Sequence, residues 1–288
     1  MASMHFPLLV FDSVYLCPAP KASGQSNLLD GFARFYVETD SWYEPFQDDF
    51  GPMNLGTIYS FCTLLDREIE RQPNKLAVTV PDDPKEITNA SFLLGTYLIM
   101  KRDKGVDAVN AIFNPIRELI LSYRDVSKGP QNFHLHLADC WGGLARAKQL
   151  GWVNFAPGRF DADEYASLDD PLNADLHEVI PGEMVAFRGP RDLTTSAPWE
   201  DVARPDGTFS HRRFSPSHYA PILVQLRVKL VVRLNDPQYD AATFRAAGMA
   251  VADLFYEDCT EPPVDVASKF LALADALAPR PAPPPPRR

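Results

Sequence analysis

Cysteine is scarce in this sequence, and its few occurrences lie far apart. The four residues occupy positions 17, 62, 140 and 259 of 288. No pair has the short spacing of a zinc or iron–sulfur site, so we expect neither a metal nor another cofactor. So few cysteines are typical of proteins in a reducing compartment. The pattern excludes a disulfide scaffold and favours an intracellular protein.

Positive charge is also in short supply. The chain has 28 Lys and Arg against 38 Asp and Glu, which gives a net charge of −10. Such a chain repels nucleic acid, and a basic peptide is a better partner. No apolar run approaches the length of a membrane span. The short run "FPLLVF" (6–11) lacks a basic leader and a small-residue cleavage site, so we expect no signal peptide.

Proline, in contrast, is plentiful, with 27 residues, many of them in the tail "APRPAPPPPRR" (278–288). The tail predicts an extended, solvated polyproline II segment. Before it, strands and helices alternate. The first part predicts a helix at 54–70, a strand at 75–81, a polar loop at 82–88, and helices at 89–104 and 106–116.

A second pattern of strands and helices follows an acidic, proline-bounded connector at 157–182, whose centre (162–168) reads as helical. Segment 191–216 reads as a loop. The predicted strands lie at 184–190, 228–235 and 249–258, and the last helix ends at Leu277. The alternation predicts an α/β fold with two domains. Their expected bounds are 1–156 and 183–277, joined by the linker 157–182 and followed by the tail 278–288.

Four stretches together carry a family resemblance: "SWYEPFQDDFGPMNLGTIYSFC" (41–62), "NASFLLGTYLIM" (89–100), "FDADEYASLDDPLNADLHEVIPGEMVAFRGP" (160–190) and "VVRLNDPQYDAATFRAAGMAVADLFYED" (231–258). They resemble the cell division cycle 14 dual-specificity protein phosphatases, from about Asp12 to Leu277. The resemblance implies two tandem phosphatase-like domains joined by a linker helix, with an inert first domain. It also implies removal of phosphate from Ser-Pro and Thr-Pro sites left by cyclin-dependent kinases, activity on phosphotyrosine, and a location in cytoplasm or nucleus, at spindle or centrosome.

The stretch "DCWGGLARA" (139–147) has the spacing of a cysteine-phosphatase loop, His-Cys-x-x-Gly-x-x-Arg-Ser/Thr. In such a loop a thiolate attacks phosphorus, and the Arg holds the phosphate oxygens. Here Asp139 replaces the His, and a neighbouring anion raises the pKa of a thiol. Apolar residues also follow helical spacing through Cys140. We therefore predict a helix and a coincidental match, with Gly142 and Gly143 allowing close packing on a neighbour.

The equivalent loop of the first domain lies in "VPDDPKEITNAS" (80–91). It has neither Cys nor Arg, and Asp82, Asp83 and Glu86 would repel a phosphate dianion. We expect this loop to be inactive, as the resemblance implies for the first domain.

The resemblance places Asp258, in "LFYEDC", at the position of the general acid of the second domain. The nucleophile loop is expected after the last helix and one more strand, where this sequence has the proline tail. We therefore expect the second domain to be incomplete and the chain to be inactive alone. Asp258 is then a vestige, an ordinary loop carboxylate, or part of a site completed in a longer product. Cys259 is no substitute, because Asp265 lies six residues on and two prolines remove amides from the loop.

The linker offers a binding role. The resemblance implies that acidic residues there read a basic residue after the phosphorylated site, at Asp163, Glu164, Asp169 and Asp175. Ala166 stands where family members have an acid, and a solvated charged linker is the plainer interpretation. Such carboxylates would give charge-assisted, salt-sensitive contacts with a Lys or Arg.

Three accounts of the whole chain follow. It is a fragment or natural non-catalytic relative of a dual-specificity phosphatase, a binding module for basic proteins with Ser-Pro sites, or a short product with exposed apolar edges such as "VKLVVRL". Two lesser signals remain: "HRRFSPS" (211–217) resembles a kinase target in a flexible loop, and His134 with His136 lacks a third zinc ligand.

Overall fold

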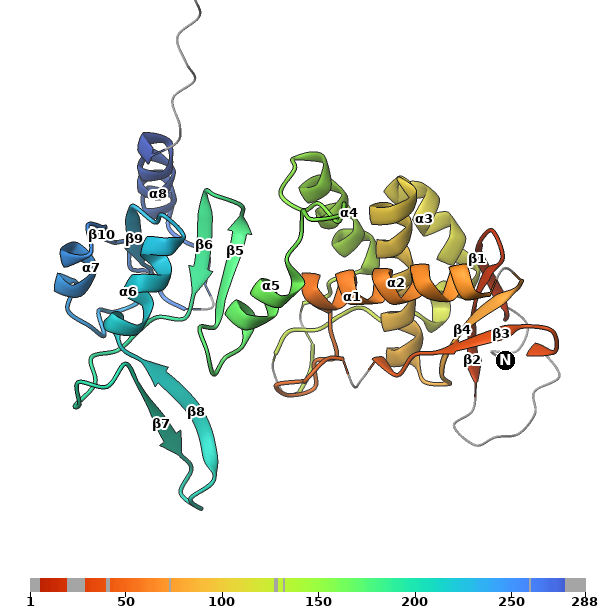
Figure 1. Cartoon of the computed structure of the whole chain (residues 1–288), viewed down its shortest axis with the longest axis horizontal. Helices are drawn as coiled ribbons and strands as arrows, with labels where there is room; N and C mark the ends of the chain where they lie inside the picture. The colour runs from red at the N-terminus through yellow and green to blue at the C-terminus, as the bar shows by residue number, and fades with distance from the viewer. Residues whose placement is uncertain are drawn as a thin grey trace, which may run out of the picture. The chain divides into compact units, whose positions relative to one another are not determined.

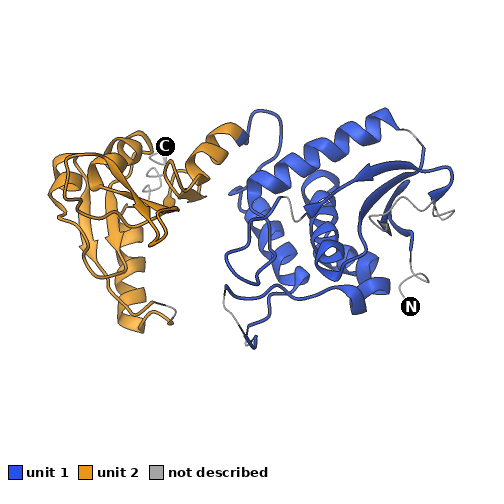
Figure 2. Cartoon of the chain, turned by 90° about the horizontal axis from the view of Figure 1, so that it is seen from below, with its two compact units in different colours: residues 1–162 blue, residues 163–288 orange. Residues whose placement is uncertain are grey.

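The computed structural model describes residues 6–19, 29–39, 42–72, 74–126, 129–131, 133–258 and 260–277. The chain divides into two compact units, 1–162 and 163–288 (Figure 2). The division falls inside the predicted linker. The proline-rich tail and Cys259 lie outside the described residues. Among those that are described, no helix is long and apolar enough to cross a membrane.

The first unit begins with a sheet of strand order β1-β2-β4-β3 (Figure 1). Its strands are β1 (Leu8–Phe11), β2 (Val14–Ala19), β3 (Ala33–Tyr36) and β4 (Leu76–Pro81). β4 pairs in parallel with β2 and β3, whereas β1 and β2 form an antiparallel hairpin. Every residue of β4 is buried, as expected for a central parallel strand rich in β-branched residues.

The helices among the described residues of this unit are α1 (Leu55–Arg71), α2 (Pro84–Arg102), α3 (Val106–Phe113), the 3-10 helix η4 (Asn114–Leu119) and α4 (Leu137–Gln149). α2 packs against α1, α3 and α4. All its residues from Glu86 to Met100 are buried. A helix that is enclosed on every side needs an apolar or hydrogen-bonded side chain at every position, and α2 has this composition.

Helix α2 begins earlier than the sequence indicated. We predicted a polar loop at 82–88, but the helix starts at Pro84 with Asp83 as its N-cap. Proline suits the first helical position because its missing N–H would have no partner there. The hydroxyl of Thr88 donates to Pro84 O at 2.7 Å and accepts from Leu121 N at 2.9 Å. The prediction of a loop was wrong because it rested on the polar residues of this segment. A polar residue such as Thr88 can lie in a buried helix when its hydroxyl has hydrogen-bond partners inside the protein.

Close packing of α2 against α4 depends on a glycine that the sequence did not single out. An added Cβ at Gly95 would lie 2.3 Å from Trp141 Cε2, which is far inside contact distance. Trp141 is buried and donates from Nε1 to Phe92 O at 3.1 Å. We predicted that Gly142 and Gly143 would make this approach, and that prediction is wrong, since a Cβ at either would meet no atom within 4 Å.

The second unit contains α5 (Ala162–Asp169, beginning at the boundary), β5 (Leu176–Ile180), β6 (Met184–Phe187), β7 (Trp199–Ala203), β8 (Phe209–Phe214), α6 (Pro216–Gln225), β9 (Leu230–Arg233), α7 (Ala242–Ala246), β10 (Ala250–Asp253) and α8 (Val264–Leu277). β5–β6 and β7–β8 are antiparallel pairs, and β9–β10 is a parallel pair. Its core gathers around Phe214, Tyr219, Leu223 and Phe244.

Two predictions for the second unit need correction. Segment 191–216 is not a loop throughout, because β7 and β8 form a hairpin across it. β8 has four consecutive polar residues between Phe209 and Phe214, and β7 has two in its centre, so their composition resembled that of a loop. The kinase-target interpretation fails with it, since Ser215 is buried and its hydroxyl donates to Pro198 O at 3.1 Å. The strand predicted at 228–235 is shorter, and only Val231 of β9 is fully buried.

Candidate functional site

The first candidate is the cavity at the carboxyl end of β4, where a phosphatase would hold phosphate. It has a volume of about 770 Å³ and includes Lys85, Asn89 and four carboxylates in its wall. The carboxylates belong to Asp49, Asp82, Asp83 and Glu86. Helix N-termini at this edge of an α/β sheet commonly bind anions, so the position is the expected one.

The N–H and hydroxyl donors that could bind an anion at this cavity already donate to the protein's own carboxylates. Asp83 Oδ1 accepts from the backbone N–H of Lys85 at 2.8 Å and of Glu86 at 3.4 Å. Glu86 Oε2 accepts from the N–H and the hydroxyl of Thr39 at 2.8 and 2.7 Å. A phosphate dianion would meet these charges instead of free amides. This geometry is compatible with an inactive loop, which stays a prediction.

Asp49 completes the acidic wall. Its carboxylate accepts from the hydroxyl of Tyr43 at 2.6 Å and from the N–H groups of Gln47 and Phe46 at 2.7 and 3.2 Å. Burial by itself would raise the pKa of Asp49, but these hydrogen bonds outweigh it and lower that pKa. Asp49 is therefore ionised at neutral pH and adds negative charge to the cavity.

The cysteine-phosphatase spacing at 139–147 lies in helix α4, as predicted. Cys140 has helical neighbours on both sides, and the guanidinium of Arg146 donates to Gln149 on the same helix at 2.7 Å. Burial, followed by the charge of Asp139, raises the pKa of Cys140 to about 11. A thiol with that pKa carries almost no thiolate at neutral pH. Cys140 and Arg146 therefore form no phosphate-binding loop.

Two further cysteines are described, and neither has nucleophilic character. Cys62 is buried on α1, and burial raises its pKa to about 12. Burial likewise raises the pKa of Cys17, which lies on β2. Low-pKa catalytic thiols instead lie near cations or helix N-termini.

The four predicted linker carboxylates all lie in the second unit. Asp163 and Glu164 are exposed in the first turn of α5. Asp169 Oδ1 lies 3.3 Å from His177 Nδ1, and Asp175 Oδ2 lies 3.7 Å from a guanidinium nitrogen of Arg188. Both partners belong to the segment of β5 and β6. Asp169 and Asp175 thus have basic neighbours in their own unit.

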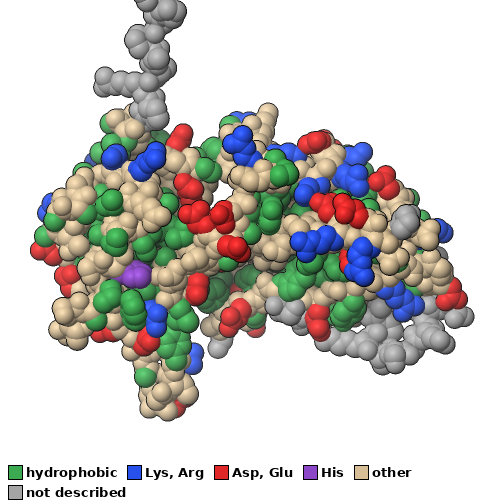
Figure 3. All heavy atoms as spheres, in the orientation of Figure 1, with side chains coloured by type: hydrophobic (Ala, Val, Ile, Leu, Met, Phe, Trp, Pro, Cys, Tyr) green, Lys and Arg blue, Asp and Glu red, His purple; other side chains and the backbone are tan. Residues whose placement is uncertain are grey.

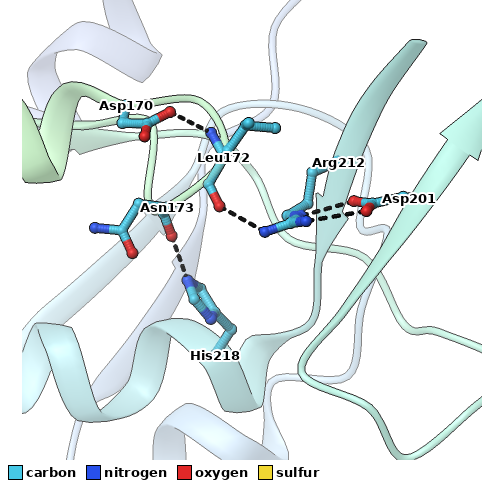
Figure 4. A network of polar contacts seen from close by, with 6 residues as sticks. All are labelled: Asp170, Leu172, Asn173, Asp201, Arg212 and His218. Atoms are coloured by element: carbon cyan, nitrogen blue, oxygen red, sulfur yellow. Dashed lines mark hydrogen bonds and ion pairs between the residues drawn. The ribbon is translucent and has the colours of Figure 1, made fainter. Parts of the chain in front are cut away.

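The turn between Asp169 and Asp175 is fixed by residues that the sequence did not single out (Figure 4). The guanidinium of Arg212 donates two hydrogen bonds, of 2.7 and 2.9 Å, to the carboxylate of Asp201 and a third, of 2.9 Å, to Leu172 O. His218 bonds to Asn173 O at 2.6 Å. The acceptors in the turn are backbone carbonyls, which leave no mark on a sequence. The basic run at 211–213 was the available signal, and we interpreted it as a kinase motif.

Asp258 lies exposed in a turn after β10. β9 and β10 are parallel, so this turn follows the carboxyl ends of the pair, where α/β folds place reactive loops. That placement is compatible with an acid role, which stays a prediction.

His134 has a local structural contact, since its Nδ1 lies 2.8 Å from the hydroxyl of Ser122. Within the described part of the chain, no three His, Cys, Asp or Glu side chains gather as metal ligands. On the face shown in Figure 3, acidic and basic side chains are interspersed.

Comparison with known proteins agrees with the resemblance. A family profile described as the N-terminal half of dual specificity protein phosphatases matches residues 9–147. The chain is 29% identical over 244 residues to human dual specificity protein phosphatase CDC14C, covering 84% of this chain and 52% of that protein. It is 30% identical over 242 residues to tyrosine-protein phosphatase cdc-14 of Caenorhabditis elegans, covering 81% and 32%.

A fungal relative extends the match along the chain. Tyrosine-protein phosphatase CDC14 of Candida albicans is 26% identical over 287 residues, covering 96% of this chain and 48% of that protein. The chain thus spans about half or less of the length of these relatives. The similarity includes the sheet, the enclosed helix α2 and the second unit. By these matches the chain belongs to the CDC14 family of dual-specificity protein phosphatases.

Proposed function

We propose that this chain is the substrate-recognition part of a CDC14-type phosphatase that reverses proline-directed phosphorylation by cyclin-dependent kinases. We further propose that the 288-residue polypeptide does not hydrolyse phosphoesters by itself. One observation carries the second statement. The Cys-x5-Arg spacing occurs once in the 288 residues, and it lies within helix α4.

The chemistry supports this proposal in two ways. Thiol catalysis needs a thiolate next to backbone amides and an Arg, and Cys140 instead has a pKa of about 11 beside Asp139. The cavity at the carboxyl end of β4, the second place where phosphate could be expected, is lined by carboxylates. Asp258 can donate a proton only to a leaving group that a nucleophile has displaced.

Recognition is proposed to rest on the linker carboxylates. Asp163 and Glu164 are exposed on α5 and can approach a Lys or Arg that follows a Ser-Pro site. Asp169 and Asp175 lie 3.3 and 3.7 Å from ring and guanidinium nitrogens of His177 and Arg188, which is longer than a strong hydrogen bond. A peptide cation can therefore exchange with these partners. The few cysteines and the family relationship support an intracellular location, in cytoplasm or nucleus.

The catalytic part of the proposal is tested with the purified 288-residue polypeptide and a phospho-Ser-Pro peptide followed by Lys. We expect phosphate release at the rate of the buffer blank. Hydrolysis that vanadate inhibits would refute the proposal, and loss of that hydrolysis in Cys140→Ser would show which thiol acts.

The recognition part is tested by fluorescence anisotropy with the same peptide at low and high salt. We expect binding that weakens with salt, because exposed charge pairs are screened. Replacing Asp163 and Glu164 together by Asn and Gln should weaken binding several-fold. Glu118→Gln is the matched control, since its side chain is 84% exposed and lies in the first unit. Equal affinity of both variants, or no binding at low salt, would contradict this role.

The same assays separate the alternative function, a non-catalytic binding module for basic Ser-Pro proteins. Such a module should bind unphosphorylated and phosphorylated peptides alike. The substrate-recognition part of a phosphatase should bind the phosphorylated peptide more tightly, or should release that peptide only after a complete enzyme has hydrolysed it.

A further inference from the structure

A second cavity in the first unit has the opposite electrical character to the acidic one. Its volume is about 380 Å³, and it adjoins the acidic cavity through Lys85, which lines both. Besides Lys85, its polar wall consists of Arg124, Ser122, His134, Gln131 and Asp48. Two permanent cations against one carboxylate make this cavity the cationic half of the pair.

We propose that this cavity binds the phosphate group of a phosphorylated peptide, without catalysis. The proposal is independent of the proposed function, because it needs no residue of the linker or of the second unit. Lys85 supplies a point charge from the first turn of α2, and Arg124 supplies a planar fork that suits phosphate oxygens. Ser122 and His134 add a hydroxyl and an imidazole, held together by their 2.8 Å hydrogen bond.

The arginine is preset for an incoming anion. One guanidinium nitrogen of Arg124 donates to Gly129 O at 3.0 Å, which orients the group. Another lies 3.7 Å from Asp48 Oδ2, which is too long for a hydrogen bond. The side chain of Asp48 is 57% exposed, so water screens this pair. A phosphate dianion in the cavity can take the place of Asp48 at the guanidinium.

The walls of the cavity are fixed before any ligand arrives. Asn89 is buried, donates to Phe50 O at 2.9 Å and accepts from the hydroxyl of Tyr123 at 3.0 Å. It thereby ties the segment of Asp48 to the segment of Arg124. Tyr123 also pairs with Leu135 in an antiparallel bridge, which brings Ser122 and His134 together. Preset donors lose little entropy on binding, which favours affinity.

One polar atom favours a ligand with an N–H or O–H donor over a fully deprotonated oxyanion such as sulfate. Gln131 Oε1 is enclosed and accepts no hydrogen bond from any residue that the structure describes. A buried acceptor without a donor is costly, and the backbone N–H of a phosphorylated peptide can supply one. Inorganic sulfate has no proton to offer.

The test uses the 288-residue chain and a fluorescein-labelled phosphoserine peptide without Lys or Arg, so that the linker carboxylates play no part. Its unphosphorylated twin is the ligand control. We expect saturable anisotropy for the phosphopeptide alone. Lys85→Gln and Arg124→Gln should each weaken binding about tenfold, the loss expected for one charge-assisted hydrogen bond. Asp48→Asn should strengthen it, because the competing carboxylate is gone.

Arg117→Gln is the matched control, since its side chain is 70% exposed outside the cavity, and we expect no change in affinity. Lys85 and Asp48 are exposed, so their variants should fold even if Arg124→Gln does not; circular dichroism checks each protein. Competition by inorganic phosphate at millimolar concentration, with the same sensitivity to Lys85→Gln, would support an oxyanion site that does not need the peptide. Binding that ignores phosphorylation, or that falls equally with Arg117→Gln, would overturn the proposal.

Discussion

Gly95→Ala is the substitution for which the structure predicts the least ordinary outcome. In most helix interiors, replacing Gly by Ala stabilises a protein by about 1 kcal/mol. Gly95 lies on α2 against the indole of Trp141, and the new methyl carbon would stand 2.3 Å from Trp141 Cε2. Carbon atoms pack at about 3.5–4.0 Å, so the indole must move by more than 1 Å.

Moving the indole is costly because Trp141 is enclosed by the core and held by a hydrogen bond. Its side chain is 1% exposed, and its Nε1 donates to Phe92 O at 3.1 Å. Overpacking of a core costs about 1–3 kcal/mol, and a lost hydrogen bond costs about 1 kcal/mol. After the gain of about 1 kcal/mol from alanine, Gly95→Ala should lower the free energy of unfolding by about 1–3 kcal/mol.

Urea denaturation followed by circular dichroism and tryptophan fluorescence measures this difference. Gly143→Ala is the control: Gly143 is exposed on α4, and its added Cβ meets no atom within 4 Å. It should raise the free energy of unfolding by about 0.5–1 kcal/mol. Opposite signs for two Gly-to-Ala changes in one unit are the signature of the contact. Equal stability of the two variants would refute the packing argument.

Three further predictions test the polar interior and the thiols. Asn89→Ala should lower the free energy of unfolding by about 2–4 kcal/mol, since it leaves the Tyr123 hydroxyl and Phe50 carbonyl unpaired; a loss below about 0.5 kcal/mol, as for a surface change, would contradict this. Because hydrogen bonds lower the pKa of Asp49, it stabilises the fold at neutral pH, and this contribution should vanish as the pH falls through the carboxyl range. Asp49→Asn should therefore flatten the acid limb of a stability-versus-pH curve, and an unchanged limb would be evidence against it. With a pKa of about 11, Cys140 should react with iodoacetamide at pH 7.5 on the order of 100-fold slower than a free cysteine, as peptide mapping can measure; a rate typical of a free thiol would rule out that pKa.

Regular, strongly periodic segments were predictable from sequence. Helix α1 matches the predicted helix at 54–70 to within one residue at each end; its N-cap is Asn54, whose Oδ1 accepts from Thr57 N at 2.9 Å, and its buried residues Ile58, Cys62 and Leu65 recur at helical spacing. Helix α7 stops before Gly248, whose φ of +86° a glycine adopts without strain. In both cases a local rule, namely capping or backbone freedom, decides the outcome.

Segments whose polar groups find partners elsewhere in the chain were not predictable. The start of α2 resembled a loop because Thr88 is polar, although its hydroxyl bonds to Pro84 O and to the distant Leu121 N. The hairpin β7–β8 resembled a loop because Arg212 belongs to a contact with Asp201 and with the carbonyl of Leu172, 40 residues away. Hydrogen bonds to backbone carbonyls at such separations carry no compositional signal.

The sequence by itself determined the family, the acidic loop after β4 and the helical setting of Cys140, because each depends on residue types close together in the chain. Only the tertiary structure decided which glycine receives Trp141 and which cations share a cavity. Arg124 and Lys85 are 39 positions apart in the sequence, and Asn89 brings their segments together through Phe50 and Tyr123. Charge and close packing act over a few ångströms in space, so their partners are set by the fold and not by neighbours in the chain.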